Sequence, residues 1–346
     1  MVSRRRKSRR RKSSGAAGFV LGFLLVALVA AGVAVWLVVA PYGPETETFV
    51  DLAPGSSTAK IGRQLQQAGV VRSGLAFDLL RFWEHGALMA GEYRFNHPLS
   101  AVEVYRRIAR GEVYTVALTV PEGANIFDIA SRVQEAGLAT RLQFLQAAVQ
   151  QAGLIASLDP KARSLEGYLF PDTYHFAKGT TAGQMVAAMV QSFRVVAREL
   201  GLKHHVHRVV TLASLVVRET AVNAEEPLVA SVFENRLAQK MPLMCDPTVI
   251  YGLELEGRWR GVIYQSDLKY NTAYNTYLHT GLPPGPVANP GISSLRAAMH
   301  PAHTDYLYFV AAGDNPQGRS LFSATLSQHS RNVAGYRRAL HMAGGR

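Results

Sequence analysis

The chain has 346 residues, enough for a membrane segment and two compact domains, since a domain usually holds about 100–200 residues. Hydrophobic residues make up 48% and charged residues 18%, so most of the chain can bury a core and global disorder is excluded. A single cysteine, Cys245, excludes a disulfide scaffold and a four-cysteine zinc site. Residues 1–14 hold eight Lys or Arg and no acid, so of the net charge of +12 the other 332 residues carry only +4. This distribution argues against a nucleic-acid-binding body.

Residues 16–40 form an apolar run without a charged side chain. As a helix the run would reach about 37 Å, more than the hydrocarbon core of about 30 Å. Trp36 and Tyr42 lie near its far end, where interfacial aromatic residues are favoured. Because the basic tail precedes the run, the positive-inside rule predicts a cytoplasmic N-terminus and an extracytoplasmic remainder. A cleaved signal peptide is the alternative, although its apolar region usually holds about 7–15 residues.

An internal repeat follows the apolar run, in residues 54–70 and 122–138. Each copy has an apolar lead-in, a glycine turn and a helix that ends in Ala-Gly, which is a helix C-cap signal. The repeat predicts two strand–turn–helix units, which resemble LysM-type carbohydrate-binding modules, with a spacer domain as the alternative. Between the copies, residues 91–95 are expected to form a strand and residues 100–110 a capped helix.

The remaining sequence predicts a helix-rich domain. Helices are expected at about 181–200, 206–221, 227–240 and 327–342, with a strand at 306–310. Residues 241–301 are dense in Pro, Gly, Asn, Tyr and Thr and are expected to be irregular and functional. The sequence therefore predicts an α+β protein with four parts: a basic cytoplasmic tail (1–15), a transmembrane helix (16–40), a LysM-like repeat region (41–160) and a catalytic domain (161–346).

Glu219 is the strongest single candidate for chemistry. On a helix it shares one face with apolar residues at seven, four and three positions earlier, namely Leu212, Leu215 and Val216. Burial of that face would leave the carboxyl near the core, where desolvation raises its pKa. A raised pKa is what a general acid needs to carry a proton at neutral pH. The alternative is a carboxylate paired with Arg218 or Arg236, or one exposed by fraying of the helix.

Other chemistries have less in their favour. Residues 271–277 bring amides, hydroxyls and aromatic rings together, a composition that suits sugar rings as well as simple packing. The histidines at 204, 205 and 207 are interpreted as solvated, since no acid or thiol lies near them in sequence, and Cys245 as a small packed residue. No serine-hydrolase elbow, phosphate loop or dinucleotide fingerprint is present in the sequence.

The chain resembles the endolytic murein transglycosylases, the MltG/YceG-like group. The motifs that carry the resemblance occur in the family's order: EGYLFPDTY (166–174), ASLVVRET (213–220), VASVFENRL (229–237), DPTVIYG (246–252), YNTY (274–277), GLPPGP (281–286) and HPA (300–302) leading into YLYFV (306–310). The family usually has a Glu-Lys-Glu order at 217–219. Here Val217 replaces the first glutamate, and Glu219 matches the second, which is the family's catalytic residue.

The resemblance implies a single-pass inner-membrane enzyme that cleaves nascent peptidoglycan strands internally, between N-acetylmuramic acid and N-acetylglucosamine. The product would carry a 1,6-anhydro-muramic end. The implied cellular role is in cell-wall elongation and the termination of glycan chains. Peptidoglycan strands are the implied partner, peptidoglycan synthases are candidate partners, and no metal, cofactor or nucleic acid is needed. By motif match Glu219 would be catalytic, and the sugar cleft would be lined by Glu166, Asp246, Thr248, Tyr251, Asn275 and Tyr277.

Two alternatives remain open from the sequence. The first is a membrane-anchored glycan-binding scaffold for peptidoglycan synthases that does not cut. The second is a muramidase that uses water, which would need a second carboxyl near Glu219, with Asp246 and Glu166 as the candidates.

Overall fold

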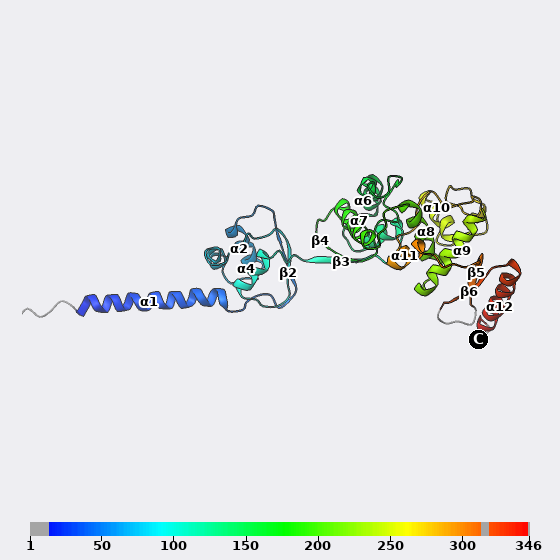
Figure 1. Ribbon diagram of the computed structural model, residues 1–346. Helices are drawn as coiled ribbons and strands as arrows, with labels where there is room; N and C mark the ends of the chain where they lie inside the picture. Colours follow the sequence, from blue (N-terminus) through cyan, green and yellow to red (C-terminus); the bar gives the residue numbers. More distant parts are fainter. Residues whose placement is uncertain (1–13, 313–317, 345–346) are drawn as a thin grey trace, which may run out of the picture. The chain divides into compact units, whose positions relative to one another are not determined.

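The computed structural model describes residues 14–312 and 318–344 (Figure 1). The chain has a mixed α+β fold and divides into two compact units, Met1–Thr115 and Val116–Arg346. Each unit has its own hydrophobic core. The predicted α+β class is therefore confirmed, with an apolar helix at the N-terminal end of the described residues.

The first unit starts with the apolar helix α1 (Ser14–Val39). Within the described residues Gly18–Val39 is the one helix long and apolar enough to cross a membrane, with a hydropathy of 2.7. No part of its most apolar window is buried against protein, so the helix is compatible with a single-pass membrane anchor.

A small βααβ arrangement follows α1. Its elements are β1 (Thr48–Leu52), α2 (Thr58–Gln67), α3 (Gly74–Leu79), the 3₁₀ helix η1 (Leu80–Phe82) and β2 (Gly91–Phe95), followed by α4 (Ala101–Ala109). β1 and β2 pair antiparallel, with Thr48 opposite Phe95 and Leu52 opposite Gly91. The strand predicted at 91–95 and the helix predicted at 100–110 are both confirmed.

The expected cap of α4 is a complete capping box. The Ser100 hydroxyl accepts from the Glu103 amide, and the Glu103 carboxylate accepts from the Ser100 amide in return. Val104 and Ile108 are both fully buried, as their spacing on one helix face predicts. Both side chains belong to the same core cluster as Tyr93 and Phe95 of β2.

The second unit contains the predicted helices together with several that the sequence did not indicate. Its elements are β3 (Thr115–Thr119), α5 (Ile126–Glu135), α6 (Arg141–Gln150), η2 (Ala152–Ile155), β4 (Thr173–Ala177), α7 (Ala182–Glu199), α8 (Val206–Glu219), η3 (Asn223–Glu225), α9 (Glu226–Ala238), α10 (Asp246–Leu255), η4 (Asp267–Lys269), α11 (Ile292–Met299), β5 (Tyr308–Ala311), β6 (Ser320–Ser323) and α12 (Leu326–Gly344). Strands pair as β3 with β4 and β5 with β6. α8 packs against both α9 and α11, which places it centrally in the unit.

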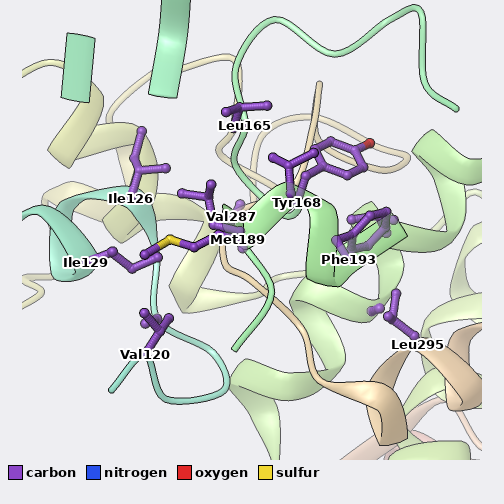
Figure 2. Packing of buried hydrophobic residues seen from close by; sticks show 14 of the residues in the cluster. Val120, Ile126, Ile129, Leu165, Tyr168, Met189, Phe193, Val287 and Leu295 are labelled. Atoms are coloured by element: carbon purple, nitrogen blue, oxygen red, sulfur yellow. The ribbon is translucent and has the colours of Figure 1, made fainter. Parts of the chain in front are cut away.

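The core of the second unit gathers side chains that lie far apart in sequence. Figure 2 shows Ile126, Leu165, Met189 and Val287 converging with the aromatic rings around them. The Tyr168 and Phe193 rings meet edge to face, with 5.1 Å between their centroids. This packing fixes the helices that present the site described below.

The two copies of the repeat lie in different units. Each has the predicted strand, turn and helix, and the turn glycines Gly55 and Gly123 both have positive φ, +74° and +76°. The unit boundary at Thr115/Val116 differs from the sequence-based boundary at 160/161. The reason lies in packing, since the second copy buries Ile129 and Val133 in the core of the C-terminal unit.

The expectation that residues 241–301 are wholly irregular is wrong. The helices α10 and α11 and the 3₁₀ helix η4 lie inside this range. Pro247 stands in the first turn of α10, where a missing amide costs no helical hydrogen bond, so this proline helps to start a helix. The high proline and glycine content of this range had suggested irregular chain, so neither α10 nor α11 was predicted.

Candidate active site

Glu219 is the last residue of α8, and the packing of that helix sets its position. The face predicted to be buried is buried: Leu212, Leu215 and Val216 have no exposed surface. The Glu219 side chain is partly exposed, because the helix reaches the surface of a cavity at its C-terminal end. The carboxyl therefore stands at the border between the core and an open space.

The cavity beside Glu219 has a volume of about 270 Å³. α8, α9, β5, α12 and the chain before and within the first turn of α10 contribute to it. Its lining residues are Glu219, Phe233, Arg236, Leu243, Met244, Asp246, Pro247, Tyr277, Phe309 and His329. Apolar rings and charged groups are thus both present, as a site for sugar rings requires.

Burial raises the pKa of the Glu219 carboxyl, and this desolvation is the largest influence on it. The Cys245 thiol donates a hydrogen bond to Glu219 Oε1 at 2.9 Å, which favours the charged form and partly opposes the rise. The nearby charge of Asp246 raises the pKa further, whereas Arg218 and Arg236 lower it. The balance holds the Glu219 carboxyl protonated to a higher pH than an ordinary glutamate.

Arg236 lies in the cavity wall, but its donors serve the backbone. Its Nε donates to Leu307 O at 2.7 Å, and its Nη1 donates to Leu243 O at 2.9 Å and to Pro242 O at 3.3 Å. The Arg236 guanidinium therefore ties together the segments that carry the cavity. It influences Glu219 through its charge, which lowers the pKa of that carboxyl.

Cys245 is buried, as predicted, and its thiol has a raised pKa because of that burial and of the negative charge of Glu219. It is therefore a neutral hydrogen-bond donor at neutral pH. Its backbone amide donates to Thr276 Oγ1 at 3.0 Å, which fixes the residue in place. The contact with Glu219 was not expected, since 26 residues separate the two in sequence.

Two of the predicted substrate-binding residues, Asp246 and Tyr277, line the cavity together with Glu219. The Tyr277 hydroxyl donates to Asp246 Oδ1 at 2.6 Å. Burial and the Asp246 carboxylate raise the pKa of Tyr277, so this phenol stays protonated. The cavity thus holds a second carboxyl and a neutral aromatic hydroxyl beside Glu219.

Thr248 and Asn275 lie behind the wall of the cavity, and their side chains are fully buried. Thr248 Oγ1 donates to Cys245 O at 2.6 Å. Asn275 Nδ2 donates to Leu268 O and Tyr270 O, and its Oδ1 accepts from the Tyr277 amide at 2.9 Å. These side chains are bonded to the protein itself, so they position Cys245 and Tyr277 and are not cleft-lining residues as the motifs had implied.

Glu166 and Tyr251 belong to a separate buried cluster, which is not part of the cavity lining. Glu166 accepts from the Ile126 amide through Oε2 and from Asn289 Nδ2 through Oε1, both at 2.9 Å. Tyr251 hydrogen-bonds to the same carboxyl, and complete burial raises the Glu166 pKa to about 8. The expectation that these two residues line the cleft is therefore not met in the structure.

His329 of α12 was not indicated by the sequence reasoning. Its ring lines the cavity and stacks on Tyr308, with 5.1 Å between centroids and 21° between planes. Its Nδ1 is buried without a hydrogen-bond partner, and burial together with Arg236 lowers its pKa. The imidazole at the cavity wall is therefore neutral at pH 7. The sequence could not place His329 at the site, because 110 residues separate it from Glu219 and only the folded chain brings both to one cavity.

Val217 occupies the position of the family's first glutamate and packs away from the cavity lining. Its Cγ2 lies 3.6 Å from the point where a Cβ on Gly123 would stand. Arg218 Nη1 donates to Gly123 O at 3.1 Å. The side chains of 217 and 218 therefore fasten α8 to the turn of the second repeat copy.

The interpretation of the histidine tract as solvated is wrong for His207. Its Nδ1 lies 2.7 Å from Asp159 Oδ2, and its Nε2 lies 2.9 Å from Pro284 O. The acidic partner comes from 48 residues earlier in the chain. Among residues 14–312 and 318–344, no group of three or more His, Cys, Asp or Glu side chains is arranged to hold a metal ion.

Comparisons with known proteins identify relatives over most of the chain. Residues 50–335 match the model of the YceG-like family. An endolytic murein transglycosylase of Bacillus subtilis (strain 168) is 32% identical over 309 residues, which cover 83% of this chain and 84% of that relative. An endolytic murein transglycosylase of Streptococcus pneumoniae (strain ATCC BAA-255 / R6) is 32% identical over 321 residues, which cover 82% of this chain and 57% of that relative.

A solved structure has the same fold. The crystal structure of a protein of Listeria monocytogenes described as yceG-like is 31% identical in sequence, with a TM-score of 0.54. The match covers 83% of this chain and 99% of the Listeria chain. Since the family model spans the residues that build both units and the cavity around Glu219, the chain belongs to the YceG-like family.

Proposed function

We propose that this protein is an endolytic lytic transglycosylase that cleaves nascent peptidoglycan between N-acetylmuramic acid and N-acetylglucosamine, with Glu219 as its acid and base. The observation that carries the proposal is the Glu219 carboxyl, whose pKa burial raises, at the wall of a cavity of about 270 Å³. Relatives that cover most of this chain are named endolytic murein transglycosylases. The proposed role in the cell is termination of glycan chains during wall elongation.

The proposed reaction needs one carboxyl. Neutral Glu219 donates its proton to the glycosidic oxygen as the bond from that oxygen to C1 of muramic acid breaks. The Glu219 carboxylate then accepts the proton of the muramic acid 6-hydroxyl while that oxygen bonds to C1, which closes the 1,6-anhydro ring and restores the acid. Because the attacking hydroxyl belongs to the same sugar, it has the high effective concentration of a tethered nucleophile.

Neighbouring groups would assist at defined points. The Cys245 thiol bonded to Glu219 Oε1 would hold the carboxyl in one orientation and stabilise the carboxylate formed halfway through the reaction. Tyr277 and His329 would offer neutral hydrogen-bonding groups to sugar hydroxyls. Val217 would leave the chemistry intact, since it is absent from the cavity lining.

A hydrolytic muramidase is the second candidate, and the presence of Asp246 in the same cavity is what favours it. In that reaction Asp246 would activate water or attack C1 itself while Glu219 acts as the acid. Glu166, the other carboxyl considered from the sequence, lies in the separate buried cluster. The two reactions differ in the ends that they leave on the glycan.

The test is mass spectrometry of glycan products. The full chain in detergent would be incubated with uncrosslinked nascent peptidoglycan, beside the Glu219→Gln variant. Anhydro-muramic ends from the parent alone are expected. Reducing ends would instead support hydrolysis with Asp246. If a folded parent gave no products, the protein would be assigned as the non-cutting scaffold.

We further propose that α1 anchors the protein in the plasma membrane once, with residues 1–15 in the cytoplasm and the rest on the outer side. The charge of the tail and the length of Gly18–Val39 are the reasons for this topology. Nascent glycan strands lie on that side of the membrane, so peptidoglycan synthases are candidate partners. We propose in addition that the LysM-like region binds glycan.

A further inference from the structure

The first unit has a concentrated apolar surface on the outer side of α3 and η1. Leu75, Leu79, Phe82 and Trp83 follow one another at helical spacing and are 71%, 44%, 63% and 74% exposed. We call these side chains the α3 stripe. The opposite side of the same segment faces the core through Phe77 and Leu80. The segment is thus apolar on both faces, although only one face is covered by the protein.

The segment is held rigidly, so the exposure of the stripe is a fixed property of the fold. Ser73 caps α3 by accepting from the Ala76 amide, and Gln66 accepts from the Gly74 amide. Gly62 of α2 and Gly74 approach so closely that a Cβ on either would lie within 2.6 Å of the other's carbonyl oxygen. α3 therefore cannot turn the stripe inward without losing this packing.

The stripe begins next to the end of the apolar helix. α1 contacts both α3 and α4, and Val38 packs against the core of the unit. The Arg72 guanidinium lies 4.3 Å from the Trp36 ring centre and 4.7 Å from that of Tyr42, and its Nη2 donates to Pro41 O. Arg72 comes just before α3, three residues before Leu75.

These contacts set the depth of the stripe if α1 spans a bilayer. Trp and Tyr at the end of a spanning helix lie at the level of the lipid headgroups, and Arg72 shares that level through its contacts with both rings. Leu75 follows Arg72 by three residues, which span at most about 10 Å, so Leu75 lies near that level. Leu, Phe and Trp side chains are those that enter the headgroup–acyl boundary.

We propose that the α3 stripe rests in the interfacial layer of the membrane that α1 enters, as a second contact of the first unit with lipid. This inference rests on the proposed membrane anchoring and is independent of the proposed catalysis. The stripe fixes the first unit against the bilayer at two points, one through α1 and one through α3, and so limits its tilt.

The three tryptophans of the chain allow a direct test, because they lie in α1, in the stripe and in the second unit, at positions 36, 83 and 259. Single-tryptophan variants of the full chain would be prepared by replacing the other two with Phe. Each would be reconstituted in vesicles of phosphatidylcholine and phosphatidylglycerol. Lipids brominated near the glycerol end of the acyl chain would act as quenchers, with iodide as the aqueous quencher.

Strong quenching of Trp83 by the shallow brominated lipid, similar to that of Trp36, and protection from iodide are expected. Trp259 should respond only to iodide. Trp83 quenched by iodide but not by lipid would overturn the proposal, since the stripe would face water. Protection of Trp83 from both quenchers would also overturn it, in favour of contact with a second copy. Failure of Trp36 itself to be quenched would instead contradict the membrane anchor.

A variant with Leu75, Leu79 and Phe82 replaced by Ser supplies the second measurement. The exposed side chains are absent from the core, so the variant should fold with an unchanged circular dichroism spectrum. Lipid quenching of Trp83 should fall markedly in this variant, and that of Trp36 should not change. Equal lipid quenching of Trp83 in variant and parent would contradict the role of the stripe.

Discussion

Desolvation raises the pKa of both Glu219 and Glu166, yet the two carboxyls stand in different surroundings. Glu166 is sealed inside the second unit, where an amide and an Asn289 side chain donate to its two oxygens. Glu219 has a thiol as its donor and reaches a cavity that also holds Asp246 and Tyr277. Desolvation alone therefore does not mark a catalytic acid, since access to an open space distinguishes the two.

The largest expected effect of this difference is on activity. Replacing Glu219 with Gln removes the proton donor while keeping the shape, so the rate of glycan cleavage should fall by about 10²–10⁴-fold. Glu166→Gln is the matched variant, because it changes a second buried carboxyl in the same way outside the cavity. It should cleave at a rate close to that of the parent. Initial rates of glycan-fragment release measure the activity of both variants. Equal losses of rate would mean that access to the cavity does not distinguish Glu219 from Glu166.

The buried Glu166 should also make the stability of the protein depend on pH. In the folded protein Glu166 keeps its proton up to about pH 8, whereas in the unfolded chain an ordinary glutamate loses it near pH 4.3. The folded state thus binds more protons between these values, so the free energy of unfolding should fall as pH rises through that window. One such group contributes a slope of at most about 1.4 kcal/mol per pH unit.

Glu166→Gln should flatten this slope, because glutamine does not titrate. Urea unfolding of the full chain in detergent between pH 5 and 8 measures the slope. Glu135→Gln, at an exposed position, is the control and should leave it unchanged. Part of the slope should persist in Glu166→Gln, since burial also raises the pKa of Glu254, to about 7. An unchanged slope would mean that Glu166 is charged in the fold.

The sequence predicted those parts of the fold that depend on neighbouring residues. The capping box at Ser100 and Glu103, the strand at 91–95 and the glycine turns of the repeat all rest on contacts within a few positions. α10 was missed because Pro247 and the surrounding turn-forming residues suggested irregular chain. The proline in fact occupies the first turn, where it has no helical hydrogen bond to break.

The site could be predicted only in part, for a related reason. Glu219 was found because its buried helix face is a local pattern of apolar residues. Its hydrogen bond comes from Cys245, the charge of Arg236 lowers its pKa, and His329 of α12 lines the same cavity. Only the fold of the second unit brings these residues together. Motif matching predicted Thr248 and Asn275 as lining residues, but it cannot distinguish a side chain that lines a cavity from one that supports its wall.

Asp246 should set the alkaline limit of activity. Its negative charge raises the pKa of Glu219, so Asp246→Asn should lower that pKa and move the alkaline limb of the rate–pH profile to lower pH. Tyr277→Phe is the control, because it removes the hydrogen bond to Asp246 without removing a charge. A complete loss of cleavage at every pH in Asp246→Asn would instead assign Asp246 a direct role, as hydrolysis requires.

Cys245 should affect the pKa of Glu219 in the opposite direction to Asp246. Its thiol donates to Glu219 Oε1 and so favours the carboxylate, which means that Cys245→Ala should raise the pKa of Glu219 and extend the alkaline limb to higher pH. Cys245→Ser keeps a donor at the same place and should stay close to the parent. Rate–pH profiles of the parent and the two variants should therefore differ in the position of their alkaline limbs. A shift of the Ala variant in the same direction as Asp246→Asn would contradict this reading of the thiol, and would mean that its packing, not its hydrogen bond, controls Glu219.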